Sequence, residues 1–119
     1  MCHVLIIEDD WLISDHIAQL VEAAGAVSID TADTEDEAVA LALAHHPEVI
    51  ISDVTLAAGT GPAAVDRITA ELGQVPVMFI TGEPRGFTPR SPEMCILHKP
   101  VADRTLLETF KALASLPHK

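Results

Sequence analysis

Hydrophobic positions along the chain alternate between short continuous runs and stretches with helical spacing. The short runs are rich in Val, Ile and Leu, which is typical of strands buried on both faces of a parallel sheet. Between them, apolar residues recur every three or four positions, as on one face of a helix. The pattern predicts five strands, at residues 3–7, 27–31, 49–53, 77–80 and 94–97. It predicts four helices, at residues 11–24, 34 to about 45, 62 to about 72 and 103 to about 116.

Local signals mark where these helices begin and end. Gly25 stands where the first helix should stop. Thr34 and Glu37 have the spacing of a capping box, in which the threonine hydroxyl accepts from the Glu37 N–H and the glutamate reaches back. Pro62 suits a first helical position. Asp103 is expected to cap the last helix.

Alternating strands and helices predict an α/β fold, with one doubly wound parallel sheet and right-handed crossovers. The 119 residues fit a single domain spanning 1–119, without repeats or linkers. One helix is missing from the alternation. Residues 83–92 contain three prolines, two arginines and a glycine, so we predict a loop there and a fourth helix that is shortened or absent.

Composition narrows the choice of partner. Hydrophobic residues make up 49% of the chain but aromatic ones only 3%, so the core must be aliphatic. The net charge of −11, with seven Lys and Arg, argues against nucleic-acid binding and favours a protein partner or a cation. No secretory signal or membrane-length apolar run is found, and Cys2 and Cys95 are expected to be reduced, which predicts a cytoplasmic protein without membrane contact.

Charged and hydroxyl side chains follow the predicted strands at their carboxyl ends, where ligands bind in open α/β sheets. They are Glu8, Asp9 and Asp10 after the first strand, Asp53 at the end of the third, Thr81 after the fourth and Lys99 after the fifth. Two carboxylates about 4 Å apart repel by about 4 kcal/mol at an effective dielectric constant near 20. Either a cation, for which Mg²⁺ is the natural candidate, or a carboxyl group that keeps its proton must relieve this repulsion.

Such a site suits attack by a carboxylate on a phosphoryl group. Asp53 stands alone at the end of the central strand and is the best nucleophile. Mg²⁺ held by Glu8 and Asp9 would neutralise phosphoryl oxygens, and Lys99 and Thr81 would contact the others. Gly82 is expected to leave room for the approach beside Thr81.

Four stretches of the chain, in order, resemble the signature stretches of response regulator receiver domains. They are Ile-Ile-Glu-Asp-Asp at 6–10, Ile-Ile-Ser-Asp at 50–53, Phe-Ile-Thr-Gly at 79–82 and His-Lys-Pro at 98–100. The resemblance implies a flavodoxin-like three-layer fold with sheet order 2-1-3-4-5. It implies transfer of a phosphoryl group to Asp53 from a histidine kinase or a phosphotransfer protein. Mg²⁺ would then be bound by Asp9, Asp53 and the Thr55 carbonyl, with Glu8 acting through water. The Lys99–Pro100 peptide would be cis.

The chain departs from the family pattern in places. Ala57 stands where receivers usually have proline, and Ile96 where they have a switching Tyr or Phe, whereas Gly61 matches. Residues 76–82 resemble the PFxFATG motif of a branch paired with HWE-type histidine kinases. The resemblance also places Thr55 and Glu83 at positions that tune self-dephosphorylation. We hypothesise that a mobile 83–92 segment orders on phosphorylation.

Other polar and aromatic residues near the predicted site are expected to have ordinary structural roles. Asp10 is expected to cap the first helix or face solvent, Trp11 to pack rather than shield the pocket rim, and His45 and His46 to form a solvated helix end. His16 and His98 are expected to be ordinary surface groups.

The favoured function is a phosphorylated, non-enzymatic receiver that switches a protein–protein interaction or acts as a phosphate sink. Two other functions compete with it. The first is a pseudo-receiver that acts only as a protein-interaction module. The second is a haloacid dehalogenase-type phosphohydrolase, which Thr55 disfavours because that chemistry wants aspartate there. The expected oligomeric state is a monomer or a weak homodimer, acting on a downstream protein target.

Overall fold

A computed structural model describes residues 2–82 and 94–116, which contain five strands and four helices. In chain order these elements are β1 (His3–Ile7), α1 (Trp11–Ala23), β2 (Ser28–Ala32), α2 (Glu35–Ala44), β3 (Val49–Asp53), α3 (Gly61–Leu72), β4 (Val77–Thr81), β5 (Met94–His98) and α4 (Asp103–Ala114). Each lies within two residues of the boundaries that the hydrophobic pattern predicts.

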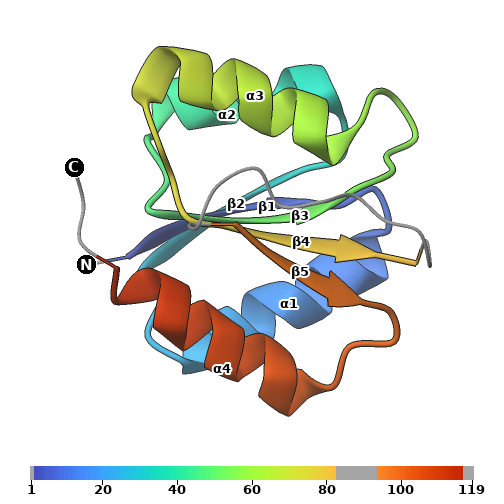
Figure 1. The fold of residues 1–119 in the computed structure, drawn as a ribbon, viewed down its shortest axis with the longest axis vertical. Helices are drawn as coiled ribbons and strands as arrows, with labels where there is room; N and C mark the ends of the chain where they lie inside the picture. Colours follow the sequence, from blue (N-terminus) through green and yellow to red (C-terminus); the bar gives the residue numbers. More distant parts are fainter. Residues whose placement is uncertain (1, 83–93, 117–119) are drawn as a thin grey trace.

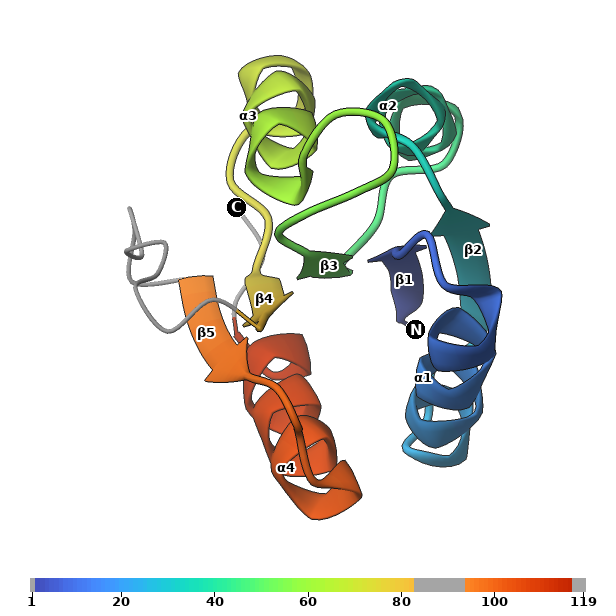
Figure 2. The same ribbon diagram turned by 90° about the vertical axis from the view of Figure 1, so that its right-hand side faces the viewer.

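All five strands are parallel and form one sheet in the order β2-β1-β3-β4-β5. Helices α2 and α3 cover one face, and α1 and α4 cover the other (Figures 1 and 2). The expected doubly wound α/β fold is thus confirmed. The order also places β1 and β3 side by side in the middle of the sheet, and their carboxyl ends carry the acidic residues.

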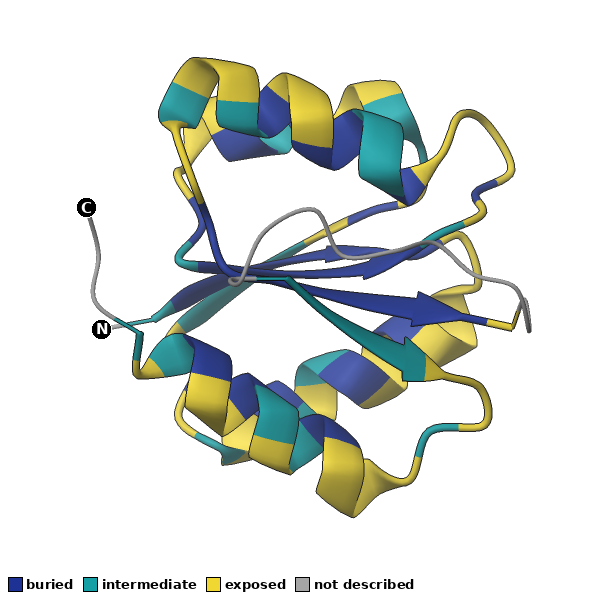
Figure 3. Cartoon of the chain, in the orientation of Figure 1, coloured by how far each residue is buried: buried dark blue, intermediate teal, exposed yellow. Residues whose placement is uncertain are grey.

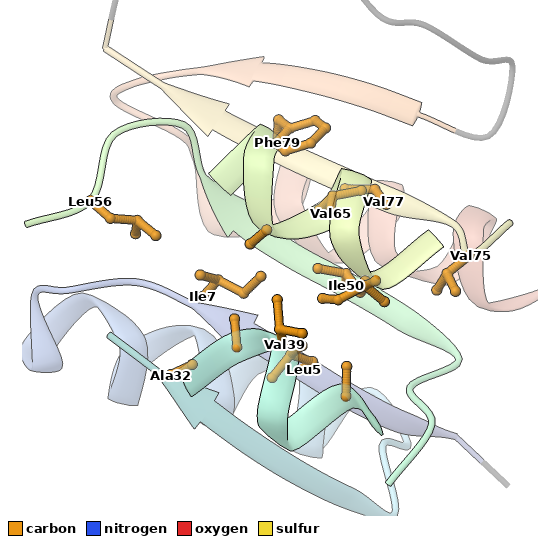
Figure 4. Close-up of a cluster of buried hydrophobic side chains, with 14 residues drawn as sticks. Leu5, Ile7, Ala32, Val39, Ile50, Leu56, Val65, Val75, Val77 and Phe79 are labelled. Carbon is orange, nitrogen blue, oxygen red and sulfur yellow. The ribbon is translucent and has the colours of Figure 1, made fainter. Parts of the chain in front are cut away.

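Successive strand residues point to opposite faces of the sheet and divide the core into two clusters. Leu5 and Ile7 of β1 pack under α2 and α3, whereas Val4 and Ile6 pack over α1 and α4. The first cluster, which includes the buried ring of Phe79, is drawn in Figure 4. Because β1, β3 and β4 are buried on both faces (Figure 3), the register of the central strands is strongly specified.

The helix caps follow the predictions with two differences. The Thr34 hydroxyl accepts from the Glu37 N–H at 3.2 Å as expected, but the Glu37 carboxylate accepts from the Asp33 N–H at 2.9 Å. The prediction that Asp103 caps α4 is wrong. Ala102 holds the cap position without a side-chain bond, and Asp103 is the first helical residue. Its carboxylate instead lies 2.9 Å from the His16 Nε2 atom of α1.

Residues 83–93, between β4 and β5, lie outside the described residues. The expectations about a short or absent fourth helix, about Glu83 and about ordering of 83–92 therefore stay predictions. Among the helices of residues 2–82 and 94–116, none combines the length and the apolar character needed to cross a membrane.

Candidate functional site

Three carboxylates converge at the carboxyl ends of β1 and β3, the edge that faces the viewer in Figure 2. Glu8 and Asp9 follow β1 directly, and Asp53 is the last residue of β3. One oxygen from each carboxylate lies within 4.8 Å of the other two. Glu8 and Asp53 are buried, with 5% and 9% of their surface exposed, whereas Asp9 is open to solvent. The predicted acidic cluster is therefore assembled, with one side accessible.

The spacing of these oxygens suits a hard divalent cation. Around Mg²⁺, ligand oxygens at about 2.1 Å from the metal are separated by about 3 Å when adjacent and about 4 Å when opposite. Oxygens grouped within 4.8 Å need only small side-chain adjustments to reach such a geometry. Glu8, Asp9 and Asp53 are thus the side chains that would hold the ion.

Lys99 reaches the cluster from β5. Its Nζ atom donates to Asp53 Oδ2 at 3.1 Å, and its backbone N–H donates to the Thr81 carbonyl at 2.8 Å. The peptide between Lys99 and Pro100 is cis, as the resemblance implied. One ammonium group faces three carboxylates, so the cluster retains an excess of negative charge when all three are ionised.

The charges of the cluster perturb two of its groups. Burial raises the pKa of Glu8 to about 7, and the charge of Asp53 adds to this, although the Asp10 N–H that donates to Glu8 Oε2 at 3.2 Å acts in the opposite direction. Burial alone would lower the pKa of Lys99, but its hydrogen bond to Asp53 and the neighbouring negative charges outweigh burial and raise it. Without a cation, Glu8 therefore keeps its proton up to about neutral pH.

This pKa predicts how the free energy of unfolding depends on pH. A carboxyl pKa raised from 4.5 to about 7 on folding means that the folded state binds more protons in that interval. The stabilisation is fully present below pH 4.5 and is lost as pH rises to about 7, with a slope of at most about 1.4 kcal/mol per pH unit. Chemical denaturation without Mg²⁺ should reveal the slope as a difference between the wild type and Glu8→Gln. Saturating Mg²⁺ should hold Glu8 ionised and so reduce the slope between pH 4.5 and 7, and a constant difference across that interval without Mg²⁺ would contradict the assignment.

The structure locates the remaining predicted residues, Thr81, Thr55 and Asp10, but it does not test every role predicted for them. Thr81 is buried at the end of β4, beside the edge where Lys99 follows β5. Thr55 is exposed in the loop after β3 and forms an isolated bridge with Thr60, so its role as a carbonyl ligand stays a prediction. Asp10 caps α1 as expected, accepting from the Leu12 and Ile13 N–H groups at 3.0 and 3.4 Å.

Of the two glycines near this edge, Gly61 and Gly82, only Gly61 occupies a position where a side chain would clash with the protein. A Cβ atom on Gly61 would collide with the backbone oxygen of Asp53 and with Ser52 Oγ. Only glycine therefore allows the start of α3 to approach the strand end that carries Asp53. A Cβ on Gly82 would lie 4.0 Å from Lys99 Cδ, an ordinary contact. This contact concerns only the protein's own atoms, so the expectation that Gly82 leaves room for an incoming group beside Thr81 stays a prediction.

Trp11 corrects another expectation. Its side chain is 74% exposed, so the packing role predicted for it is wrong. It lines a hollow of about 390 Å³ together with Glu8 and Asp9. Trp11 shares the helical spacing of the buried Ser14 and Ile17, but it lies in the first turn of α1, beside the acidic cluster. Helical spacing alone did not reveal that Trp11 lies beside the acidic cluster. The spacing identifies the buried face of a helix but not which end of that helix lies at the edge of the sheet.

The sequence family described as the response regulator receiver domain matches residues 4–111. The chain is 38% identical over 96 residues to the phyllosphere-induced regulator PhyR of Methylorubrum extorquens strain AM1, covering 79% of this chain and 36% of that protein.

Two solved structures extend this likeness to three dimensions. The anti-anti-sigma factor PhyR of Bartonella quintana has a TM-score of 0.78 and 34% identity, over 95% of this chain and 46% of that one. The receiver domain of PhyR from Erythrobacter litoralis has a TM-score of 0.79 and 30% identity, over 99% and 95%. The chain thus spans less than half of the two longer PhyR proteins.

Proposed function

Because the chain belongs to the response regulator receiver domain family of two-component signalling, we propose that it accepts a phosphoryl group on Asp53 and thereby switches a protein–protein interaction. The observation that carries this proposal is the grouping of Asp53 with a lysine ammonium at 3.1 Å and two further carboxylates within 4.8 Å. A nucleophile, a cation site and a charge-stabilising donor then meet at one accessible edge.

The side chains divide the chemistry among them. An Asp53 carboxylate oxygen forms the bond to phosphorus while the bond from phosphorus to the donor breaks, and the departing group leaves with the bonding electrons. Glu8, Asp9, Asp53 and the Thr55 carbonyl would hold Mg²⁺, which would supply positive charge to the phosphoryl oxygens. Lys99 donates to a phosphoryl oxygen, and we assign the Thr81 hydroxyl the same role.

A histidine kinase or a histidine phosphotransfer protein is the proposed donor. The stretch at 76–82 that resembles the PFxFATG motif favours an HWE-type kinase. Downstream, the similarity to PhyR, whose name in one organism includes anti-anti-sigma factor, favours a protein involved in sigma-factor regulation as the target. We further propose that the protein is cytoplasmic and is a monomer or a weak homodimer.

The proposal is tested by incubating the protein with acetyl phosphate and Mg²⁺ and measuring its intact mass. We expect the mass of one added phosphoryl group, dependent on Mg²⁺ and absent from Asp53→Asn. Trp11 is the only tryptophan and the chain has no tyrosine, so we expect the intrinsic fluorescence beside Glu8 and Asp9 to change when Mg²⁺ binds.

The competing function is a pseudo-receiver that binds proteins without accepting phosphate. This alternative predicts that no adduct forms with acetyl phosphate or with a kinase, whether or not Mg²⁺ changes the fluorescence of Trp11. The complete set of acids, Asp53 and Lys99 in one place disfavours this alternative.

A further inference from the structure

A second group of side chains that could ligate a metal lies at the opposite end of the sheet. His3 begins β1, Asp30 lies in the neighbouring strand β2, and His45 caps the C-terminus of α2. One possible ligand atom from each lies within 4.8 Å of the other two. His3 begins β1 and Glu8 follows its end, so roughly 16 Å of strand separates this group from the acidic cluster. We propose that His3, Asp30 and His45 bind a transition metal ion of the Zn²⁺ class.

The His3 ring is already held as a ligand would be. Only 4% of its surface is exposed. Its Nδ1 atom lies 2.7 Å from Ser28 Oγ, and its Nε2 atom lies 3.1 Å from Asp30 Oδ2. When Nδ1 carries the proton and donates it to Ser28, Nε2 presents its lone pair to a metal. Metal-binding histidines are commonly oriented by such a bond from their other nitrogen.

The distance to Asp30 fits the proposed ion. In a tetrahedral zinc site with bonds of about 2.1 Å, neighbouring ligand atoms are about 3.4 Å apart. The His3 Nε2 and Asp30 Oδ2 atoms are separated by 3.1 Å. The Asp30 side chain is 31% exposed, so it has the freedom to swing aside and let the ion take the place of the shared proton.

The His45 ring supplies the third ligand after a rotation. It stacks on the His3 ring with centroids 3.5 Å apart and an angle of 13° between the planes. Parallel rings do not direct two in-plane lone pairs at one point. His45 is exposed at a helix end, however, so its ring can turn toward the ion while the buried His3 ring stays in place. Opening of the stack is therefore part of the proposal, and water completes the coordination.

The surroundings favour a cation at this point. The last carbonyls of α2 give this end of the helix a partial negative charge, and α2 has no basic residue in its last turn. Glu48 lies beside His3 as well, since its Oε1 atom accepts from the His3 N–H at 3.3 Å. Two imidazoles and one carboxylate form a donor set that suits Zn²⁺ better than Mg²⁺, which prefers oxygen ligands.

The sequence alone pointed away from this site. The adjacent His45 and His46 cannot face one ion from a single helix, and on that ground they were expected to form a solvated helix end. The structure shows that His45 instead meets His3, which is 42 positions earlier in the chain. No local spacing signals that contact.

The proposal is tested by calorimetric titration of the untagged protein with Zn²⁺, in saturating Mg²⁺ so that the acidic cluster is occupied. We expect one Zn²⁺ per chain, and at least about tenfold weaker binding for His45→Ala. His46→Ala is the matched control, an exposed neighbouring histidine that should bind like the wild type. Asp30→Asn should weaken binding in the same way as His45→Ala.

Co²⁺ adds a readout of geometry. We expect visible absorption typical of tetrahedral coordination in the wild type and in His46→Ala, and its loss in His45→Ala. Zn²⁺ should also raise the melting temperature of the wild type but not of His45→Ala. Absence of Zn²⁺ binding, or equal binding by His45→Ala and the wild type, would overturn the proposal. Neither result affects phosphorylation of Asp53, which is measured separately.

Discussion

Lys99→Ala is expected to slow transfer of a phosphoryl group to Asp53 by about a hundredfold or more, without weakening the binding of Mg²⁺. The Lys99 ammonium lies 3.1 Å from Asp53, where the phosphoryl group must arrive, and donates in a partly buried environment. Removing one such preorganised donor removes stabilisation of the charge that develops during transfer. The same ammonium repels a divalent cation held by Glu8, Asp9 and Asp53, so its loss should leave the affinity for Mg²⁺ unchanged or higher.

The two effects are separated by measuring both on the same protein. The rate is followed by intact mass with acetyl phosphate, and Mg²⁺ affinity by the fluorescence of Trp11. Lys99 also lowers the pKa of Glu8, so the affinity is measured well above pH 7, where Glu8 is ionised in either protein. Lys111→Ala, an exposed change of equal charge on α4, should match the wild type in both measurements. A parallel loss of rate and Mg²⁺ affinity in Lys99→Ala would show that the lysine instead maintains the cation site.

The sequence predicts both the sheet and the acidic cluster because strands that are buried on both faces have a strongly specified register. The doubly buried runs that contain Ile7 and Asp53 leave little choice of register, because a slip of one residue would exchange the two core faces. Once β1 and β3 are parallel neighbours, the acids that follow them must meet at one edge. Pattern and chemistry therefore predict that Glu8, Asp9 and Asp53 share one edge of the sheet, and the family resemblance supplies the strand order that brings them together.

Contacts between elements that are not sheet neighbours were not predictable in this way. Asp103 looked like a helix cap, yet its carboxylate lies beside His16 of α1, because the packing of α1 against α4 decides which partner it meets. Trp11 looked like a core residue, and the stacked pair of His3 and His45 had no local signal. Each of these outcomes depends on where a helix lies relative to the sheet and to the other helices. Hydrophobic periodicity does not encode that position.

Gly61→Ala is expected to lower the free energy of unfolding by at least about 2 kcal/mol and to disturb the position of Asp53. Replacing glycine with alanine usually stabilises a helix by about 1 kcal/mol, so the expected sign is reversed here. The added Cβ would collide with the Asp53 backbone oxygen and Ser52 Oγ. Neither atom can move freely, because β3 is held on both sides by β1 and β4. Displacement of the helix start would also strain the bond from the Gly61 N–H to the Val54 carbonyl, which measures 3.0 Å.

Chemical denaturation measures the loss of stability, and Gly82→Ala provides the matched control. At Gly82 the same substitution meets only an ordinary 4.0 Å contact with Lys99 Cδ, so stability should change by less than about 0.5 kcal/mol. At a temperature where both proteins stay folded, Gly61→Ala should also accept phosphoryl groups more slowly, because its nucleophile is displaced from Mg²⁺ and Lys99. If Gly61→Ala proved as stable and as reactive as the wild type, the close approach of α3 to the end of β3 would not position Asp53.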